Sequence, residues 1–112
     1  MNIHNLKLQE KPFNSIKNNE KTIEMRLYDE KRKLIKARDE IIFTNIVTGE
    51  TIRVKVLNIY LFKNFNELYK NFDKLKLGYK ENEKASPDDM NIYYSKEEQQ
   101  KFGVCGIEIK LI

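Results

Sequence analysis

Apolar and polar residues alternate along much of this chain, which predicts a fold built mainly from short strands. Strands are expected over residues 3–8, 21–27 and 40–45, from residue 51 to about 62, and over 104–112. In the long fourth segment Ile52, Val54 and Val56 share one face, but both faces become apolar after Val56. That change predicts a bulge or a sharp bend near residues 56–58.

Helical segments are expected between these strands. Pro12 suits the first position of a helix whose inner face carries Phe13 and Ile16. Two pairs of residues have the spacing of a capping box and each opens a short helix: Asn64 with Glu67, and Ser95 with Glu98. The second of these helices ends at Gly103. About five to six strands with two or three short helices indicate an α+β, barrel-like fold.

The segment after the first capping box combines a clear pattern with an unclear one. Helical spacing relates four residues that we expect to face the core: Phe65, Leu68, Tyr69 and Phe72. The following residues 73–92 are polar and poorly patterned, apart from a turn or helix start at residues 86–89.

Length and composition predict one domain over residues 1–112, with 40% hydrophobic residues to form its core. No apolar run approaches the roughly 20 residues of a membrane span, and the first residues do not resemble a secretory signal. The single cysteine has no partner for an internal disulfide, so a reducing cytoplasm is the expected location. Cys105 falls on the inner face of the last strand, where we expect a buried, inert thiol.

The formal net charge of +4 is a weak indication of a polyanionic partner. Residues 17–38 hold eight Lys or Arg against four acidic residues, and the rest of the chain is balanced. Three of the four arginines, Arg26, Arg32 and Arg38, lie in that window. Arginine is suited to bidentate contact with phosphate and to stacking on a base. The window is therefore the first place to look for nucleic-acid binding.

Several kinds of chemistry lack the residues they need. A zinc site needs about four ligands, and the chain has one histidine, His4, and one cysteine far from it in sequence. The four glycines form no phosphate-binding loop, and a Ser–His–Asp triad would have to use His4. We therefore expect no metal and no cofactor.

Charged residues cluster in the second predicted strand. Alternation places Thr22, Glu24 and Arg26 on one face and Ile23, Met25 and Leu27 on the other, with Lys21 at the entrance of the strand. One interpretation is a solvated outer face, where an exposed Glu–Arg pair contributes under about 1 kcal/mol. The other is a site, because an ammonium, a carboxylate and a guanidinium together can hold an anion and move a proton.

Motifs spread over most of the chain resemble a known family. Residues 19–26, Asn19-x-Lys21-x-x-Glu24-x-Arg26, resemble the G-x-K-x-x-E-x-R signature of ASCH domains, which belong to the PUA-like group of small β-barrel proteins. Residues 36–43 and 93–109 resemble the K-x-G-D-x-I-x-F and YYS…YGV.GI.I segments of small bacterial members. Asn19 and Arg38 stand where the family has glycine, and Asn tolerates a positive φ better than Arg does.

This resemblance implies binding of RNA or of a modified nucleoside or nucleotide in a cleft beside the barrel. Four side chains would contact phosphate or a base edge: Lys21, Glu24, Arg26 and Arg32. Tyr28, Tyr93 or Tyr94 could stack on a base, or could pack into the fold instead.

The resemblance also leaves an enzymatic alternative open, because some compact ASCH proteins are amidohydrolases of acetylated cytidine nucleosides and others are implicated in RNA cleavage. In the amidohydrolase pattern Lys21 would be the central catalytic group. Glu24 stands where that pattern has Thr, so Glu24 could instead be a base that activates water. Asp88, or Asp89 beside it, would be the later acid.

Overall fold

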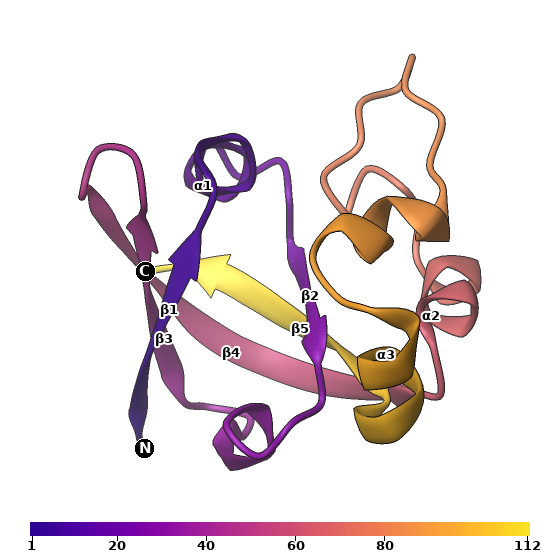
Figure 1. The fold of residues 1–112 in the computed structure, drawn as a ribbon. Coiled ribbons are helices and arrows are strands. Elements are labelled where there is room, and N and C mark those ends of the chain that lie inside the picture. Colours follow the sequence, from indigo (N-terminus) through magenta and orange to yellow (C-terminus); the bar gives the residue numbers. More distant parts are fainter.

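The computed structural model describes residues 1–112 and contains one curved sheet of five strands (Figure 1). The strands are β1 (Ile3–Leu8), β2 (Ile23–Leu27), β3 (Glu40–Asn45), β4 (Thr51–Phe62) and β5 (Val104–Leu111). Their order in the sheet is β1-β3-β4-β5-β2, with β1 parallel to β3 and all other pairs antiparallel. The sheet curls into a half-barrel whose two edge strands, β1 and β2, are close in sequence. The predicted α+β class is confirmed, with five strands.

The long strand β4 belongs to both halves of the sheet. Its first residues pair with β3, and from Val54 onward it pairs with β5. The register between β4 and β5 shifts between Val56 and Asn58, which confirms the predicted bulge. The bulge lets β4 keep Val54 and Val56 fully buried while the strand bends.

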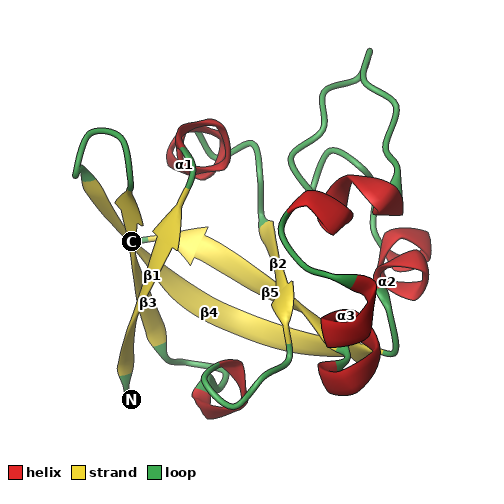
Figure 2. Cartoon of the chain, viewed as in Figure 1, coloured by secondary structure: helices red, strands yellow, loops and turns green.

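Three short α-helices and two 3₁₀ helices complete the fold: α1 (Glu10–Lys17), α2 (Phe65–Asn71), α3 (Lys96–Phe102), Arg32–Leu34 and Pro87–Ile92. Figure 2 shows α2, α3 and their connecting segment together on one side of β2, while α1 lies over the end of β1. The side chains of Asn64 and Ser95 cap α2 and α3 as predicted, and α3 ends at Gly103 with a φ of 69°. Pro12, predicted at the first helical position, is the third residue of α1.

The hydrophobic core has two parts. One lies inside the curved sheet under α1, and its largest members are Phe13 and Phe43. The other lies between β2 and the α2 side of the molecule, around Phe65 and Leu68. Leu77 and Met90, from the poorly patterned segment, are buried in this second core.

The two positions where this chain departs from glycine have left-handed backbone conformations. Asn19 has a φ of 61° and Arg38 a φ of 79°. Asn19 follows the C-cap of α1 and turns the chain back toward β2. Arg38 donates its backbone N–H to the Val56 carbonyl, which fixes the entry to β3 beside the bulge. The resemblance thus located both turns correctly.

Candidate functional site

All five residues of β2 are buried, so the charged face of this strand is not a solvated surface. Lys21 and Arg26 are 9% exposed and Glu24 only 2%. The interpretation as an exposed ion pair is therefore wrong. Ile23, Met25 and Leu27 pack in the second core. The opposite face carries Glu24 and Arg26, and Arg26 reaches across to β1.

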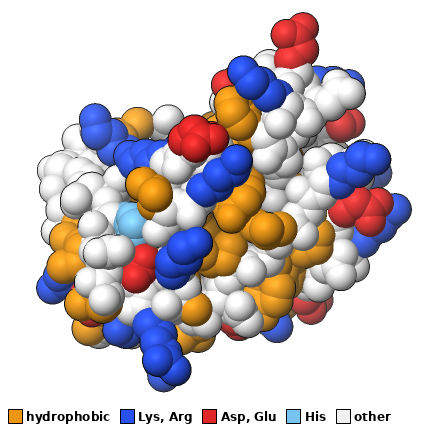
Figure 3. Space-filling model, turned by 90° about the horizontal axis from the view of Figure 1, so that it is seen from below, with side chains coloured by type: hydrophobic (Ala, Val, Ile, Leu, Met, Phe, Trp, Pro, Cys, Tyr) orange, Lys and Arg blue, Asp and Glu red, His pale blue; other side chains and the backbone are white.

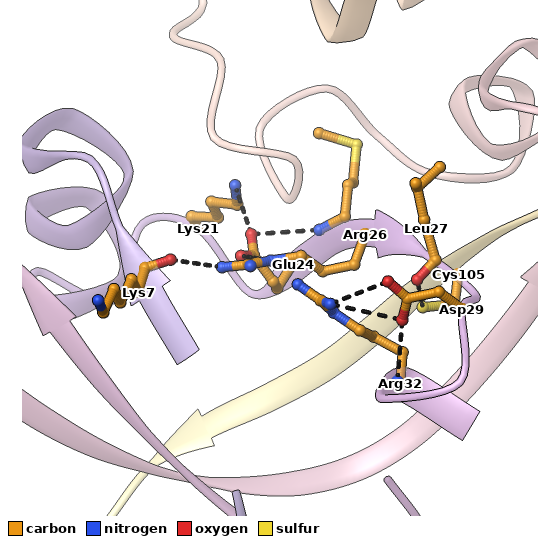
Figure 4. Close-up of polar contacts among 9 residues, drawn as sticks. Lys7, Lys21, Glu24, Arg26, Leu27, Asp29, Arg32 and Cys105 are labelled. Atoms are coloured by element: carbon orange, nitrogen blue, oxygen red, sulfur yellow. Dashed lines mark hydrogen bonds and ion pairs between the residues drawn. The ribbon is translucent and has the colours of Figure 1, made fainter. Parts of the chain in front are cut away.

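The carboxylate of Glu24 is the centre of this cluster (Figure 4). One oxygen lies 3.0 Å from Lys21 Nζ and also accepts the Met25 backbone N–H at 3.2 Å. The other oxygen accepts from Arg26 Nε at 2.8 Å. Arg26 Nη2 in turn donates to the backbone carbonyl of Lys7 at 2.7 Å. The guanidinium therefore ties β2 to β1 and joins the two edges of the half-barrel.

Electrostatics keep Glu24 and Arg26 ionised. Burial by itself raises the pKa of Glu24, but Lys21 and Arg26 beside it hold the pKa at about 2. Burial lowers the pKa of Arg26, and the charge of Glu24 more than compensates, so that pKa is raised. Glu24 is consequently a weak base near neutral pH. Its role in this arrangement is to orient two cations whose remaining N–H groups are free for other acceptors.

A cleft of about 360 Å³ opens in front of the cluster. Its floor includes Lys21, Glu24, Met25 and Arg26, and its walls come from α1 and from the segment that follows α2. Tyr93 and Tyr94 also line it. Tyr94 is half-buried and stacks on Phe65, with ring centroids 6.1 Å apart and an interplanar angle of 17°. Tyr93 is 51% exposed.

The structure places the other predicted residues away from this cleft. Tyr28 packs against the first core, with Lys33 Nζ 5.9 Å from its ring centroid. Arg32 lines a separate groove, which Arg26 also lines. Asp88 is exposed outside the cleft, and its neighbour Asp89 is the acid that lines it.

The cleft also contains a network that sequence reasoning missed. The hydroxyl oxygens of Tyr69 and Tyr79 lie 2.8 Å apart, and the Tyr79 hydroxyl donates to Asp89 at 2.7 Å. Burial is the main cause of a raised pKa for both tyrosines. Tyr69 belongs to the helical stripe assigned to the core, and Tyr79 lies in a segment without a readable pattern. The helical spacing of Tyr69 was the only sequence pattern that involved this network, and it predicted a core position for that residue.

Gly78 explains why Lys21 reaches the cleft. A Cβ at this position would lie 3.1 Å from Lys21 Cδ, and Gly78 has a φ of 103°. The Gly78 backbone therefore packs directly on the aliphatic stem of Lys21. This close approach directs the ammonium toward Glu24 and into the cleft.

Five of the eight cations of the basic window 17–38 have acidic partners, among them Lys17, which pairs with Glu50 at 2.6 Å. Arg32 pairs with Asp29 at 3.0 Å and Lys33 with Glu30 at 3.4 Å, in addition to the two cations on Glu24. Seen from below, lysine and arginine side chains are scattered among apolar and acidic ones instead of forming one continuous basic patch (Figure 3). Charge alone therefore does not define a binding face on this side.

No group of three or more His, Cys, Asp or Glu side chains is placed to hold a metal ion. No helix is both long enough and apolar enough to cross a membrane.

Comparison with known proteins gives consistent results. The ASCH domain family model matches residues 6–112. The crystal structure of hypothetical protein PH0355 is 33% identical, with a TM-score of 0.83 over 98% of this chain and 99% of that one. The solution NMR structure of protein PF0455 from Pyrococcus furiosus is also 33% identical, with a TM-score of 0.71 over 98% and 97%. No curated protein matches the chain.

Proposed function

Because the chain belongs to the ASCH domain family, we propose that it binds single-stranded RNA and takes one nucleotide into the cleft beside β2. Membership of this family supports an RNA-binding role in general. The cleft as the place of binding, and a single nucleotide as its content, are our proposal. The observation that carries it is the Lys21–Glu24–Arg26 cluster, in which a buried carboxylate orients two cations toward a tyrosine-lined cavity.

The shape of the cleft supports one nucleotide rather than a double helix. Its volume of about 360 Å³ lies at the lower end of the range typical of ligand pockets. Tyr93 is exposed at the wall of the cleft and belongs to neither part of the core, so its ring is available to lie against a base. The ammonium of Lys21 and the guanidinium of Arg26 supply donors for the acceptor atoms of a base edge or a phosphate.

Hydrolysis has less support from the geometry. A general base works best when its pKa is close to the working pH, and the pKa of Glu24 is about 2. Both oxygens of Glu24 already accept hydrogen bonds from Lys21, Arg26 and the backbone. Incubation of the protein with N4-acetylcytidine and with RNA checks this alternative directly. Turnover that Lys21→Gln abolishes would favour an enzyme over a binding module.

The test of the proposal uses fluorescently labelled oligo-A, oligo-C and oligo-U in an anisotropy titration. Tyr93→Ala should weaken binding by about 1–3 kcal/mol, which corresponds to roughly 5- to 150-fold. Lys21→Gln should weaken it further, and circular dichroism will show whether this variant remains folded. Lys110→Ala is the matched control, because Lys110 is exposed and does not line the cleft. Equal affinities for all four proteins, or no binding of any oligonucleotide, would refute the proposal.

Four further statements remain predictions: that residues 1–112 form one domain, that the family relation extends to the PUA-like superfamily, that the source is bacterial, and that the protein is cytoplasmic.

A further inference from the structure

A second groove lies on the other side of Arg26 from the cleft. Its lining consists of seven residues: Asn5, Leu6, Lys7, Arg26, Lys31, Arg32 and Thr44. Four of these are cationic and none is acidic. The cleft, in contrast, has the carboxylates of Glu24, Glu83 and Asp89 among its lining residues. Compared with the cleft, the groove therefore has the more one-sided concentration of positive charge.

Arg32 lines this groove and has one donor without a partner. Its Nη1 donates to both carboxylate oxygens of Asp29, at 3.0 and 3.4 Å, and its backbone N–H donates to Asp29 as well. The Nε atom is buried and has no partner, and it is the only such side-chain atom in the molecule. Since buried donors in proteins are normally paired, this N–H indicates an acceptor that a ligand supplies.

Arg32 and Arg26 both line this groove, and Figure 4 shows their guanidinium groups on neighbouring sides of the cluster. Each has a carboxylate of its own, Asp29 for Arg32 and Glu24 for Arg26, and no carboxylate lines the groove. Two like charges held side by side repel each other, and an anion placed between them removes that repulsion. A fork of two arginines matches the oxygen atoms of a phosphate.

The exposed edge of β1 adds backbone donors. The carbonyls of Asn2 and Leu8 accept hydrogen bonds from β3, so the backbone groups of the even-numbered residues of β1 face that strand. The backbone groups of Asn5 and Lys7 consequently face the open edge, where the Lys7 carbonyl accepts from Arg26. Their N–H groups point toward the groove that both residues line.

We propose that this groove is a phosphate subsite that binds the sugar–phosphate backbone of the RNA strand whose nucleotide occupies the cleft. That the bound strand is RNA rests on the proposed function. That the groove binds phosphate rests on the groove alone. Arg26 lies in the wall between the two cavities and lines both. It therefore joins recognition of the nucleotide to recognition of its backbone.

The first measurement follows the arginine Nε–H signals by ¹⁵N–¹H NMR. The chain has four arginines, so four signals are expected, and Arg32→Lys identifies that of Arg32 while keeping its charge. Addition of inorganic pyrophosphate and of oligo-U should both shift the Arg32 signal. Addition of uridine, which has no phosphate, should leave it in place.

The second measurement compares the salt dependence of oligo-U binding in two variants of the same loop. Each phosphate contact on a single strand contributes about 0.7 to the slope of log K against log salt concentration. Lys31→Ala should therefore reduce the slope by about 0.7. Lys33→Ala, which removes the same charge from a residue that does not line the groove, should leave it unchanged.

The outcomes separate this inference from the proposed function. If oligo-U binds but neither the Arg32 signal nor the slope in Lys31→Ala changes, the subsite is refuted and the proposed function stands. If only pyrophosphate shifts the Arg32 signal, a phosphate site exists but its assignment to RNA is wrong. If pyrophosphate leaves the signal in place and no RNA binds, both proposals fail.

Discussion

Replacement of Glu24 by glutamine tests the charge cluster most directly. Gln has nearly the same shape as Glu and keeps a carbonyl oxygen, but it removes the negative charge between Lys21 and Arg26. Both cations then remain buried without a counter-charge, because no second carboxylate contacts either of them. We expect Glu24→Gln to fold less stably although no packing volume is lost.

The structure gives the size of this effect. The pKa of Glu24 falls from its ordinary 4.5 to about 2, and a difference of one in pKa corresponds to about 1.4 kcal/mol. Ionised Glu24 therefore stabilises the folded state by about 3 kcal/mol near neutral pH. Removal of one partner from a buried ion pair typically costs about 3–5 kcal/mol, which agrees. For a domain of this size the loss lowers Tm by roughly 10–15 °C.

The pH dependence distinguishes charge from packing. Because the folded pKa of Glu24 is depressed, its contribution is fully present above about pH 5 and is lost as the pH falls toward about 2. Urea unfolding of the wild type and Glu24→Gln should differ by about 3 kcal/mol near pH 7 and by about half of that near pH 3. Glu20→Gln, at an exposed carboxylate of the preceding turn, is the control. A difference below about 1 kcal/mol near pH 7, or one that does not change with pH, would refute the reasoning.

Three further predictions concern other parts of the fold. Gly106→Ala should lower the free energy of unfolding by about 1–3 kcal/mol in urea, because a Cβ there would lie 3.2 Å from Ile23 Cγ2 and 3.3 Å from Phe72 Cε2; a loss under about 0.5 kcal/mol would contradict the packing. Arg38→Gly should raise the same free energy by about 0.5–1 kcal/mol, since glycine relieves the φ of 79°, whereas Arg38→Ala should bring no gain and serves as the control. Cys105 is 1% exposed, and burial raises the pKa of its thiol to about 12, so Ellman's reagent should react with it only after unfolding. Rapid reaction of the native protein would contradict this prediction.

Most of the fold was predictable because its signals are local. Alternation located all five strands, and the change of pattern after Val56 located the bulge in β4. The caps of α2 and α3 depend on residues three apart, so sequence alone identified Asn64 and Ser95. The three head groups of the candidate site were also predicted to converge, and the structure brings Lys21, Glu24 and Arg26 into direct contact.

Burial of the charged face could not be derived from alternation, because it depends on distant segments. A strand at the edge of a sheet normally exposes one face, but here one face of β2 packs in the second core. Residues of β1, α1 and the connection after α2 surround the cleft onto which the other face opens. That connection includes Leu77, Tyr79 and Met90, which are separated by many polar residues and show no periodicity. Their contacts come from tertiary packing onto Tyr69 and β2, and no spacing along the chain encodes them.

The charge cluster is difficult to explain by stability alone. Transfer of three charged groups from water to a buried site is expensive, and well-packed apolar residues of similar volume are often as stable or more so. The cluster makes one hydrogen bond from Arg26 to the Lys7 carbonyl and three contacts on Glu24. These interactions do not require a lysine whose other donors face a cavity. A cluster kept only for folding would have its donors satisfied within the protein. Lys21 and Arg26 instead retain free N–H groups at the wall of the cleft, and Arg26 extends the same wall to the phosphate groove. A function in ligand binding accounts for both the burial of these charges and their incomplete pairing.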